Sequence, residues 1–553
     1  MLIMNAVVAV LPTAWLHISA ITSEAGIANA TSDASGRAVA PIAGSTLNRA
    51  LLITDLHADP LYEPQASAKC RCRSACVNTS QHPRPWGQPL CDAPFTLIDA
   101  TIAAAQKVLP EPDLVLVLGC MVAHNMPSRA QSNRVFTEVM ATHLAPAVAR
   151  SRGGCAIALG NNDVFPDYAI RLDDPTFYSE QAAAAAKLCK LSADEEASLA
   201  RGGYYARAAR GGWPRILSLN TDIYTTRASA PPLDIEMEPD PYGQMEWVEA
   251  ELEAAARANT QVIIIGHMPP CLDYYTRQPN WQRGYAQRYW SLVMRHASVV
   301  AAQLYAHQHT NQFRVWSGVG GEEEAAARAA EYFGGEAPSV ELDASAAESQ
   351  PLLMLSSVSP VFGNNPSFAV IGFGDELKPR ELVGYYAGLD AHTMIAEKAP
   401  PFVELFNTSD PLHLTFGNVD PPWLTNAAFA DRAARMQDIF PTAEGEAAWE
   451  IFHRDVATNG NMTSDRSCFG FALDELKGDC KVCKGGCRVA WICLLRHGLS
   501  RGEYEACLGR LMPPTRSPRV VTGVGARGAA YLSGDLARMG YRPAHGPTSD
   551  LFG

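Results

Sequence analysis

The chain has 553 residues, and 45 Lys and Arg against 58 Asp and Glu give a formal net charge of -13. Apolar residues are 47% and charged residues 19% of the sequence, a balance that excludes a disordered chain. The negative sign disfavours nucleic acid as a partner, because counterion release from phosphates needs basic residues.

Residues 2–20 form an almost uncharged run that contains Pro12 and His17. Such a run is a poor membrane span and a fair hydrophobic region of a signal peptide. We therefore expect a signal peptide over residues 1–30, with a buried N-terminal helix as the alternative. No later run is long and uncharged enough to predict a transmembrane segment.

The 14 cysteines fall into two clusters, near residues 70–91 and 468–507, and four isolated positions. The spacing of Cys480, Cys483 and Cys487 is compatible with zinc. The signal peptide and the N-x-[ST] sequons instead favour an oxidising compartment and disulfides. The sequons are Asn29, Asn78, Asn407 and Asn461, and glycosylation is expected at the last three.

Short apolar runs rich in β-branched residues predict strands that are buried on both faces. They cover residues 51–54, 114–118, 156–159, 216–219, 262–265, 299–305, 313–316, 352–355 and 368–371. Helical spacing predicts helices over residues 95–108 and 243–257. This alternation indicates an α/β layered core. Residues 317–349, rich in Gly, Ala and Glu, predict an inserted surface loop.

Groups able to bind a metal follow most of these predicted strands. Because parallel strands place their carboxyl ends at one edge of a sheet, these groups are expected to converge there. Five such strand ends in one chain are hard to explain as separate structural residues. The groups are Asp55 and His57, Cys120 with His124, Asn161 with Asn162, His267, and His307 with His309.

The order of these motifs resembles the calcineurin-like metallophosphoesterase superfamily. Within it, the chain looks like the acid sphingomyelinase-like phosphodiesterases, on residues 243–247, 266–270, 359–366 and the cysteine-rich stretch 483–513. The resemblance implies a layered β-sandwich flanked by helices over residues 46–375. It also implies a smaller, disulfide-bridged and mainly helical C-terminal region over 376–515, with a tail over 516–553.

The same resemblance implies two zinc ions and a phosphodiester hydrolase. Asp55, His57 and His309 would bind one ion, whereas Asn161, His267 and His307 would bind the other. Cys120 stands where the family has a bridging aspartate, and His124 matches the histidine that protonates the leaving group. A small phosphodiester, a nucleotide or a phospholipid is the expected substrate, in a secreted or lysosomal-vacuolar protein.

Two departures leave alternatives open. A Cys120 thiolate could bridge two zinc ions, but a degraded site with one zinc ion or none is also compatible with it, as in a binding protein without activity. Asn162 stands where the family has a histidine. The resulting Gly-Asn-Asn-Asp motif resembles that of the endopolyphosphatases, so hydrolysis of polyphosphate is an alternative activity. Asn162 could donate a hydrogen bond to phosphate.

By the same resemblance, Cys483–Cys487 and Cys493–Cys507 are expected disulfides near the C-terminus. Cys76–Cys91 is the expected bridge near the first motif, with Cys70 or Cys72 left for another. A Cys120–Cys155 disulfide is not expected, because the two residues would lie at opposite ends of neighbouring parallel strands.

Overall fold

The computed structural model describes residues 47–67, 71–72, 83–208, 213–227, 237–273, 275, 277–315, 351–375, 377–389, 397–408, 493–495, 498 and 504–507. The expected signal peptide, the loop over 317–349 and the tail lie outside these residues. So do the sequons Asn78 and Asn461 and the cysteines Cys76, Cys483 and Cys487.

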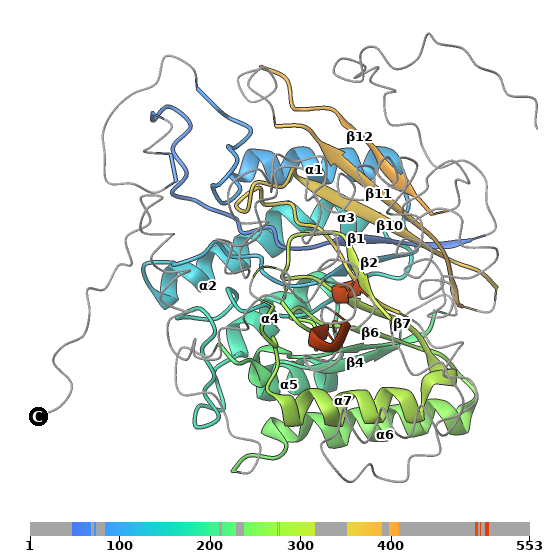
Figure 1. The fold of residues 1–553 in the computed structure, drawn as a ribbon. Coiled ribbons are helices and arrows are strands. Elements are labelled where there is room, and N and C mark those ends of the chain that lie inside the picture. The colour runs from blue at the N-terminus through green and yellow to red at the C-terminus, as the bar shows by residue number, and fades with distance from the viewer. Residues whose placement is uncertain are drawn as a thin grey trace, which may run out of the picture. The chain divides into compact units, whose positions relative to one another are not determined.

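The described strands form two six-stranded sheets (Figure 1). In the first sheet, three parallel strands continue into three antiparallel ones. Its strand order is β12 (Phe402–Asn407), β11 (Pro379–Ala387), β10 (Ser367–Phe373), β1 (Asn48–Ile53), β2 (Leu114–Val117) and β3 (Cys155–Ile157).

The second sheet has a parallel centre and antiparallel strands at both edges. Its order is β4 (Tyr205–Ala208), β5 (Arg215–Ser218), β6 (Val262–Ile265), β7 (Val300–Tyr305), β9 (Leu352–Met354) and β8 (Gln312–Arg314).

Alternate side chains of β1 face opposite layers, as the two-residue period of a strand requires. Ala50 and Leu52 belong to the apolar cluster that both sheets share, whereas Leu51 and Ile53 pack with helices on the other face of the first sheet. The second sheet has its own helix layer. The order of layers is therefore helix, sheet, sheet, helix, and this confirms the predicted sandwich.

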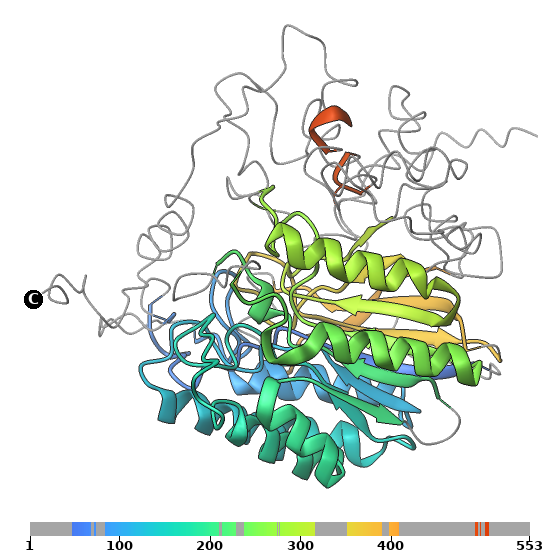
Figure 2. The same cartoon turned by 90° about the horizontal axis from the view of Figure 1, so that it is seen from below.

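Figure 2 shows the helices on both sides of the strands. The first sheet is covered by α1 (Phe95–Val108), α2 (Arg129–Glu138), the π-helix η1 (Val139–Leu144), α3 (Ala145–Ala149) and α4 (Ser179–Cys189). The second is covered by α6 (Gln244–Ala258) and α7 (Arg283–Arg295). Helix α5 (Ala193–Gly202) begins at a capping box of Ser192 and Glu195, which satisfies exposed N–H groups of its first turn.

The first sheet crosses the boundary that was expected after residue 375. Strands β11 and β12 belong to the range 376–515, yet β11 pairs with β10 and β12 pairs with β11. Further along, residues 493–495 and 504–507 are helical. Leu494 and Leu495 pack in the cluster between the sheets, so this part of the C-terminal region adds to the same core.

Three disulfides join described cysteines: Cys72–Cys91, Cys155–Cys189 and Cys493–Cys507. The last is the pair that the resemblance implied. The expected Cys76–Cys91 bridge is wrong, because Cys91 pairs with Cys72. Cys72 and Cys76 are close in the sequence, so the sequence offered no means of choosing between them. Cys120 and Cys271 are buried and free. Among the described helices, none has the length and apolar character that crossing a membrane requires.

Candidate metal centre

The expected ligands follow five strands, and the loops that carry them are tied together by backbone hydrogen bonds. The N–H of Asp55 donates to the carbonyl of Gly119 at 3.0 Å, and the N–H of His57 donates to that of Cys120 at 3.0 Å. The loop after β1 therefore lies on the loop after β2. His307, after β7, joins them by donating its N–H to Oδ2 of Asp55 at 3.2 Å.

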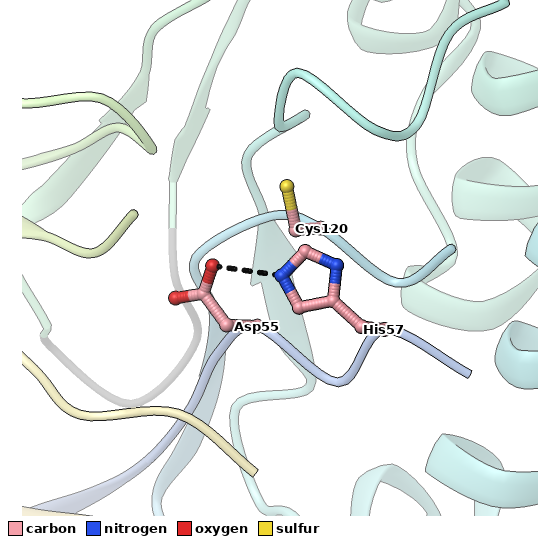
Figure 3. A group of neighbouring side chains, drawn as sticks. All are labelled: Asp55, His57 and Cys120. Atoms are coloured by element: carbon pink, nitrogen blue, oxygen red, sulfur yellow. Dashed lines mark ion pairs between the residues drawn. The ribbon is translucent and has the colours of Figure 1, made fainter. Parts of the chain in front are cut away.

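A first group of three ligand atoms consists of one carboxylate oxygen of Asp55 and two imidazole nitrogens. Oδ1 of Asp55 lies 3.4 Å from Nε2 of His57 and 3.3 Å from Nε2 of His309. The two Nε2 atoms are 3.1 Å apart. Figure 3 shows the carboxylate and the His57 imidazole turned toward each other, with Cys120 beside them.

The tautomer of His57 is set by its second nitrogen. Nδ1 lies 3.2 Å from the carbonyl oxygen of Val122, which only accepts hydrogen bonds. Nδ1 must therefore carry the proton, and Nε2 presents a lone pair to Asp55 and His309. This arrangement, in which the second nitrogen donates to a carbonyl, is typical of histidines that bind metals.

A second group of ligand atoms also contains a histidine whose Nδ1 donates to a backbone carbonyl. Nδ1 of His267 donates to the carbonyl of Leu118 at 2.7 Å, so its Nε2 presents a lone pair. That lone pair faces Sγ of Cys120 at 3.0 Å and Oδ1 of Asn161 at 3.1 Å. The ring of His307 lies 5.2 Å from that of His267, edge-on. Asp55 connects both groups, because its Oδ1 is 3.8 Å from Nε2 of His267.

Lone pairs converge here with too few protons to pair them. Oδ1 of Asp55 is buried and accepts no hydrogen bond. The Cys120 thiol has one proton, yet Nε2 of His267, Oδ1 of Asn162 at 3.3 Å and Oδ1 of Asn161 at 3.6 Å all surround its sulfur. A cation among these atoms would satisfy all of them at once, so the donor set fits a metal centre.

Burial sets the protonation of these groups. It lowers the pKa of His57 to about 3, and it also lowers the pKa of His267 and, more strongly, that of His307. The imidazoles are therefore neutral, as metal ligands must be. Burial, with the Asp163 and Asp55 carboxylates adding to it, raises the pKa of the Cys120 thiol well above its usual value. Cys120 thus needs a cation at its sulfur to become a thiolate.

Backbone strain is concentrated at these positions. Asp55, His57, Cys120, His307 and His309 have φ of 48°, 42°, 54°, 69° and 54°, in the left-handed region that costs a side chain about 1–2 kcal/mol each. Gly160 is needed for close approach, because a Cβ there would lie 2.6 Å from Sγ of Cys120. Such strain persists where the surrounding structure enforces it, often at functional sites.

Asp163 is a positioning residue that the sequence analysis did not assign. Its fully buried carboxylate accepts the N–H groups of Cys120 at 2.9 Å, Met121 at 2.7 Å, Val122 at 3.3 Å and Gly160 at 2.8 Å. It therefore holds the loop after β2 against the loop after β3. The only available signal was its place at the end of the Gly-Asn-Asn-Asp motif.

His124 lies next to the first group rather than within it. Its ring stacks on that of His57 at 4.2 Å between centroids. Its Nδ1 lies 2.9 Å from Oδ1 of the buried Asp92, and its N–H donates to Oδ2 at 3.0 Å. Asp92 thus fixes the orientation of His124. Asp92 was not assigned from the sequence; it lies 32 residues before His124, directly after the disulfide-bonded Cys91.

Asn162 and Phe362 complete the surroundings of the ligands. Oδ1 of Asn162 accepts from Nδ2 of Asn161 at 2.6 Å, while Nδ2 of Asn162 is buried without a partner. The ring of Phe362, in the loop over 359–366, lies 4.6 Å from that of His309 and 6.0 Å from that of His124. A donor and an aromatic ring therefore border the metal-ligand set.

No protein-family model matches the chain. The human acid sphingomyelinase-like phosphodiesterase 3b is 33% identical over 270 residues, which are 48% of this chain and 57% of that protein. The rat cyclic GMP-AMP phosphodiesterase SMPDL3A is 31% identical over 271 residues, 48% of this chain and 59% of that protein. The bovine sphingomyelin phosphodiesterase is 28% identical over 290 residues, 49% of this chain and 43% of that protein.

Among solved structures, a dimetal phosphatase from Danio rerio aligns with 61% of this chain and 94% of its own, at 14% identity and a TM-score of 0.34. The chain spans about half the length of the curated relatives it matches. The sequence matches confirm the resemblance that the motifs indicated: over about half of its length, the chain is similar to the acid sphingomyelinase-like phosphodiesterases.

Proposed function

We propose that this chain is a zinc-dependent phosphodiester hydrolase. The convergence of unprotonated ligand atoms on Asp55 and Cys120 carries this proposal. Asp55, His57 and His309 would bind one zinc ion, and Asn161, His267 and His307 the other, with Cys120 shared between them. The relatives named as phosphodiesterases support the reaction class.

The donor set favours zinc over harder metals. Zinc binds thiolate and imidazole, whereas magnesium and manganese prefer oxygen ligands. Here four imidazoles and one thiol accompany a single carboxylate and a single amide oxygen. A bound metal pair would lower the pKa of a shared water molecule and neutralise the negative charge of the phosphodiester.

The protein's own residues would perform the remaining steps. His124, held by Asp92, would donate a proton to the leaving alkoxide, a contribution typically worth roughly 10²–10⁴-fold in rate. Asn162 would donate a hydrogen bond from its unpartnered Nδ2 to a phosphate oxygen. Because the amide carries no acidic proton, Asn162 would bind substrate without protonating it.

We further propose an oxidising compartment, that is, a secreted or lysosomal-vacuolar protein. Three disulfides among the described cysteines support it, because cytosolic proteins seldom keep structural disulfides. The expected glycosylation site Asn407 is the last residue of β12 and is half-buried. Mass spectrometry of the protein from a secretory host would test both the disulfides and this sequon.

Metal analysis and hydrolysis of bis-nitrophenyl phosphate by the purified chain test the activity. We expect two zinc ions per chain, and loss of both the metal and the activity in His267→Ala. His296→Ala, at the half-exposed end of α7, is the matched control and should behave as the wild type. Absence of metal together with absence of hydrolysis would reject the enzyme and favour a binding protein that keeps the fold.

A further inference from the structure

A largely buried ion pair is connected through Tyr168 to the second group of metal ligands. The Nη2 atom of Arg227 is 3.1 Å from Oδ2 of Asp273, and the Asp273 side chain is 3% exposed. Arg227 also hydrogen bonds to the Tyr168 hydroxyl. The three residues come from separate loops: after β3, after the 3-10 helix η2 (Asp222–Tyr224) and after β6.

Tyr168 links this pair to the metal-ligand set. Its N–H donates to the carbonyl of Asn161 at 2.8 Å, and its ring meets that of His307 edge-on at 6.3 Å. The backbone of Tyr168 has a φ of 63°, so the loop holds this residue in a strained backbone conformation.

Arg227 is the member of this cluster that a ligand could reach. Its side chain is 20% exposed, in contrast to the closed Asp273 carboxylate. A guanidinium is always charged and suits phosphate oxygens, because its donors form a planar fork. A second carboxyl lies near Tyr168, that of Asp222. Burial raises the pKa of Asp222 well above its usual value, which favours the uncharged form of its carboxyl.

We propose that Arg227 is a specificity-determining residue that contacts a negatively charged substituent next to the cleaved phosphodiester. Asp273 and Tyr168 position its guanidinium, and Tyr168 in turn meets the His307 ring edge-on. The inference rests on the proposed function and names the substrate class: diesters that carry a second anionic group, such as an additional phosphate. A quaternary ammonium at the same place would meet the guanidinium and be disfavoured by charge repulsion.

The test compares two nitrophenyl thymidine phosphodiesters that differ only by a phosphate on the sugar, with nitrophenyl phosphorylcholine as the cationic substrate. The zinc-loaded wild type should prefer the doubly charged substrate by kcat/KM and cleave the choline ester least. Arg227→Gln should reduce that preference by about 10-fold, the value of one charge-assisted hydrogen bond.

A second variant should move the preference in the other direction. Asp273→Asn keeps an oxygen for the N–H of Tyr275, which Oδ1 accepts at 3.0 Å, but removes the charge that opposes an anion. We expect it to increase the preference for the doubly charged substrate. Arg257→Gln is the control, because Arg257 pairs with Glu253 on the exposed face of α6 and its side chain is 70% exposed.

Two outcomes are distinguishable. An unchanged substrate ratio in both Arg227→Gln and Asp273→Asn would overturn the inference and leave the ion pair a structural one. Failure of the wild type to cleave any of the three substrates would count against the proposed function instead. In that event, calorimetry measures the binding affinities of thymidine bisphosphate and thymidine monophosphate. The wild type should bind the bisphosphate more tightly, and Arg227→Gln should lose this difference. An equal loss of affinity for both ligands in the variant would overturn the inference.

Discussion

Sγ of Cys120 lies 3.0 Å from Nε2 of His267. That nitrogen is unprotonated, because the ring proton is on Nδ1, which donates it to the carbonyl of Leu118. A thiol and an unprotonated imidazole at this separation are suited to sharing one cation. Loops from the two sheets meet at this contact, because Cys120 follows β2 of the first sheet and His267 follows β6 of the second.

Cobalt substitution tests whether Cys120 is a metal ligand. The cobalt-loaded wild type should show a sulfur-to-cobalt charge-transfer band, because a coordinating cysteine is a thiolate. Cys120→Asp should lose the band and shift metal preference from zinc toward manganese, because a carboxylate is a harder ligand. The same band in Cys120→Asp would contradict coordination by this cysteine. A large gain in hydrolysis by the variant would show that the thiol impairs the site.

The leaving group of the substrate tests His124. His124→Ala should slow an alkyl phosphodiester by roughly 10²–10⁴-fold, because an alkoxide needs a proton to depart. It should slow a nitrophenyl diester far less, because nitrophenolate leaves without one. Asp92→Asn, which keeps one acceptor oxygen for His124, should show a smaller effect with the same dependence on the substrate. Equal losses with both substrates would assign His124 a positioning role.

Replacing Asp163 tests the link between the loops after β2 and β3. Asp163→Asn puts an amide group against N–H groups that its carboxylate now accepts. Leaving such buried donors unpaired should lower the free energy of unfolding by about 2–3 kcal/mol. Urea unfolding measures that loss. Metal content should fall in parallel, because Asp163 accepts the N–H of Cys120, a proposed metal ligand. Asp173→Asn, on an exposed carboxylate, is the control; equal stability of the two variants would contradict the assignment.

The Cys155–Cys189 disulfide should contribute to stability. It closes a sequence separation of 34 residues between β3 and the end of α4, and such cross-links typically stabilise by about 2–4 kcal/mol. Removing both cysteines as Cys155→Ala with Cys189→Ala should therefore lower the melting temperature, and a reducing agent should lower that of the wild type. Cys271→Ala replaces a buried cysteine outside the described disulfides. If the double variant and the Cys271→Ala control lower the melting temperature by a similar small amount, that result would count against the disulfide.

Local sequence patterns predicted the central strands and two helices closely. Strand β6 and helix α1 begin and end at the expected residues, because each is a continuous apolar or amphipathic segment with clear boundaries. Strands β4, β11 and β12 were missed. They stand at or near sheet edges, where exposed and polar positions weaken the apolar pattern.

The residue types that could bind a metal, and their place after strands, could be predicted from the sequence, since that information is local. The sequence also marked Cys120 and Asn162 as departures from the pattern of the resembling family. The folded structure was needed to show that Asp163 joins two loops, that Asp92 orients His124, that Cys91 pairs with Cys72, and that Tyr168 connects Arg227 to His307. Each of these depends on segments far apart in the chain being brought together, and hydrogen bonds and charges act across space without leaving a pattern in the sequence.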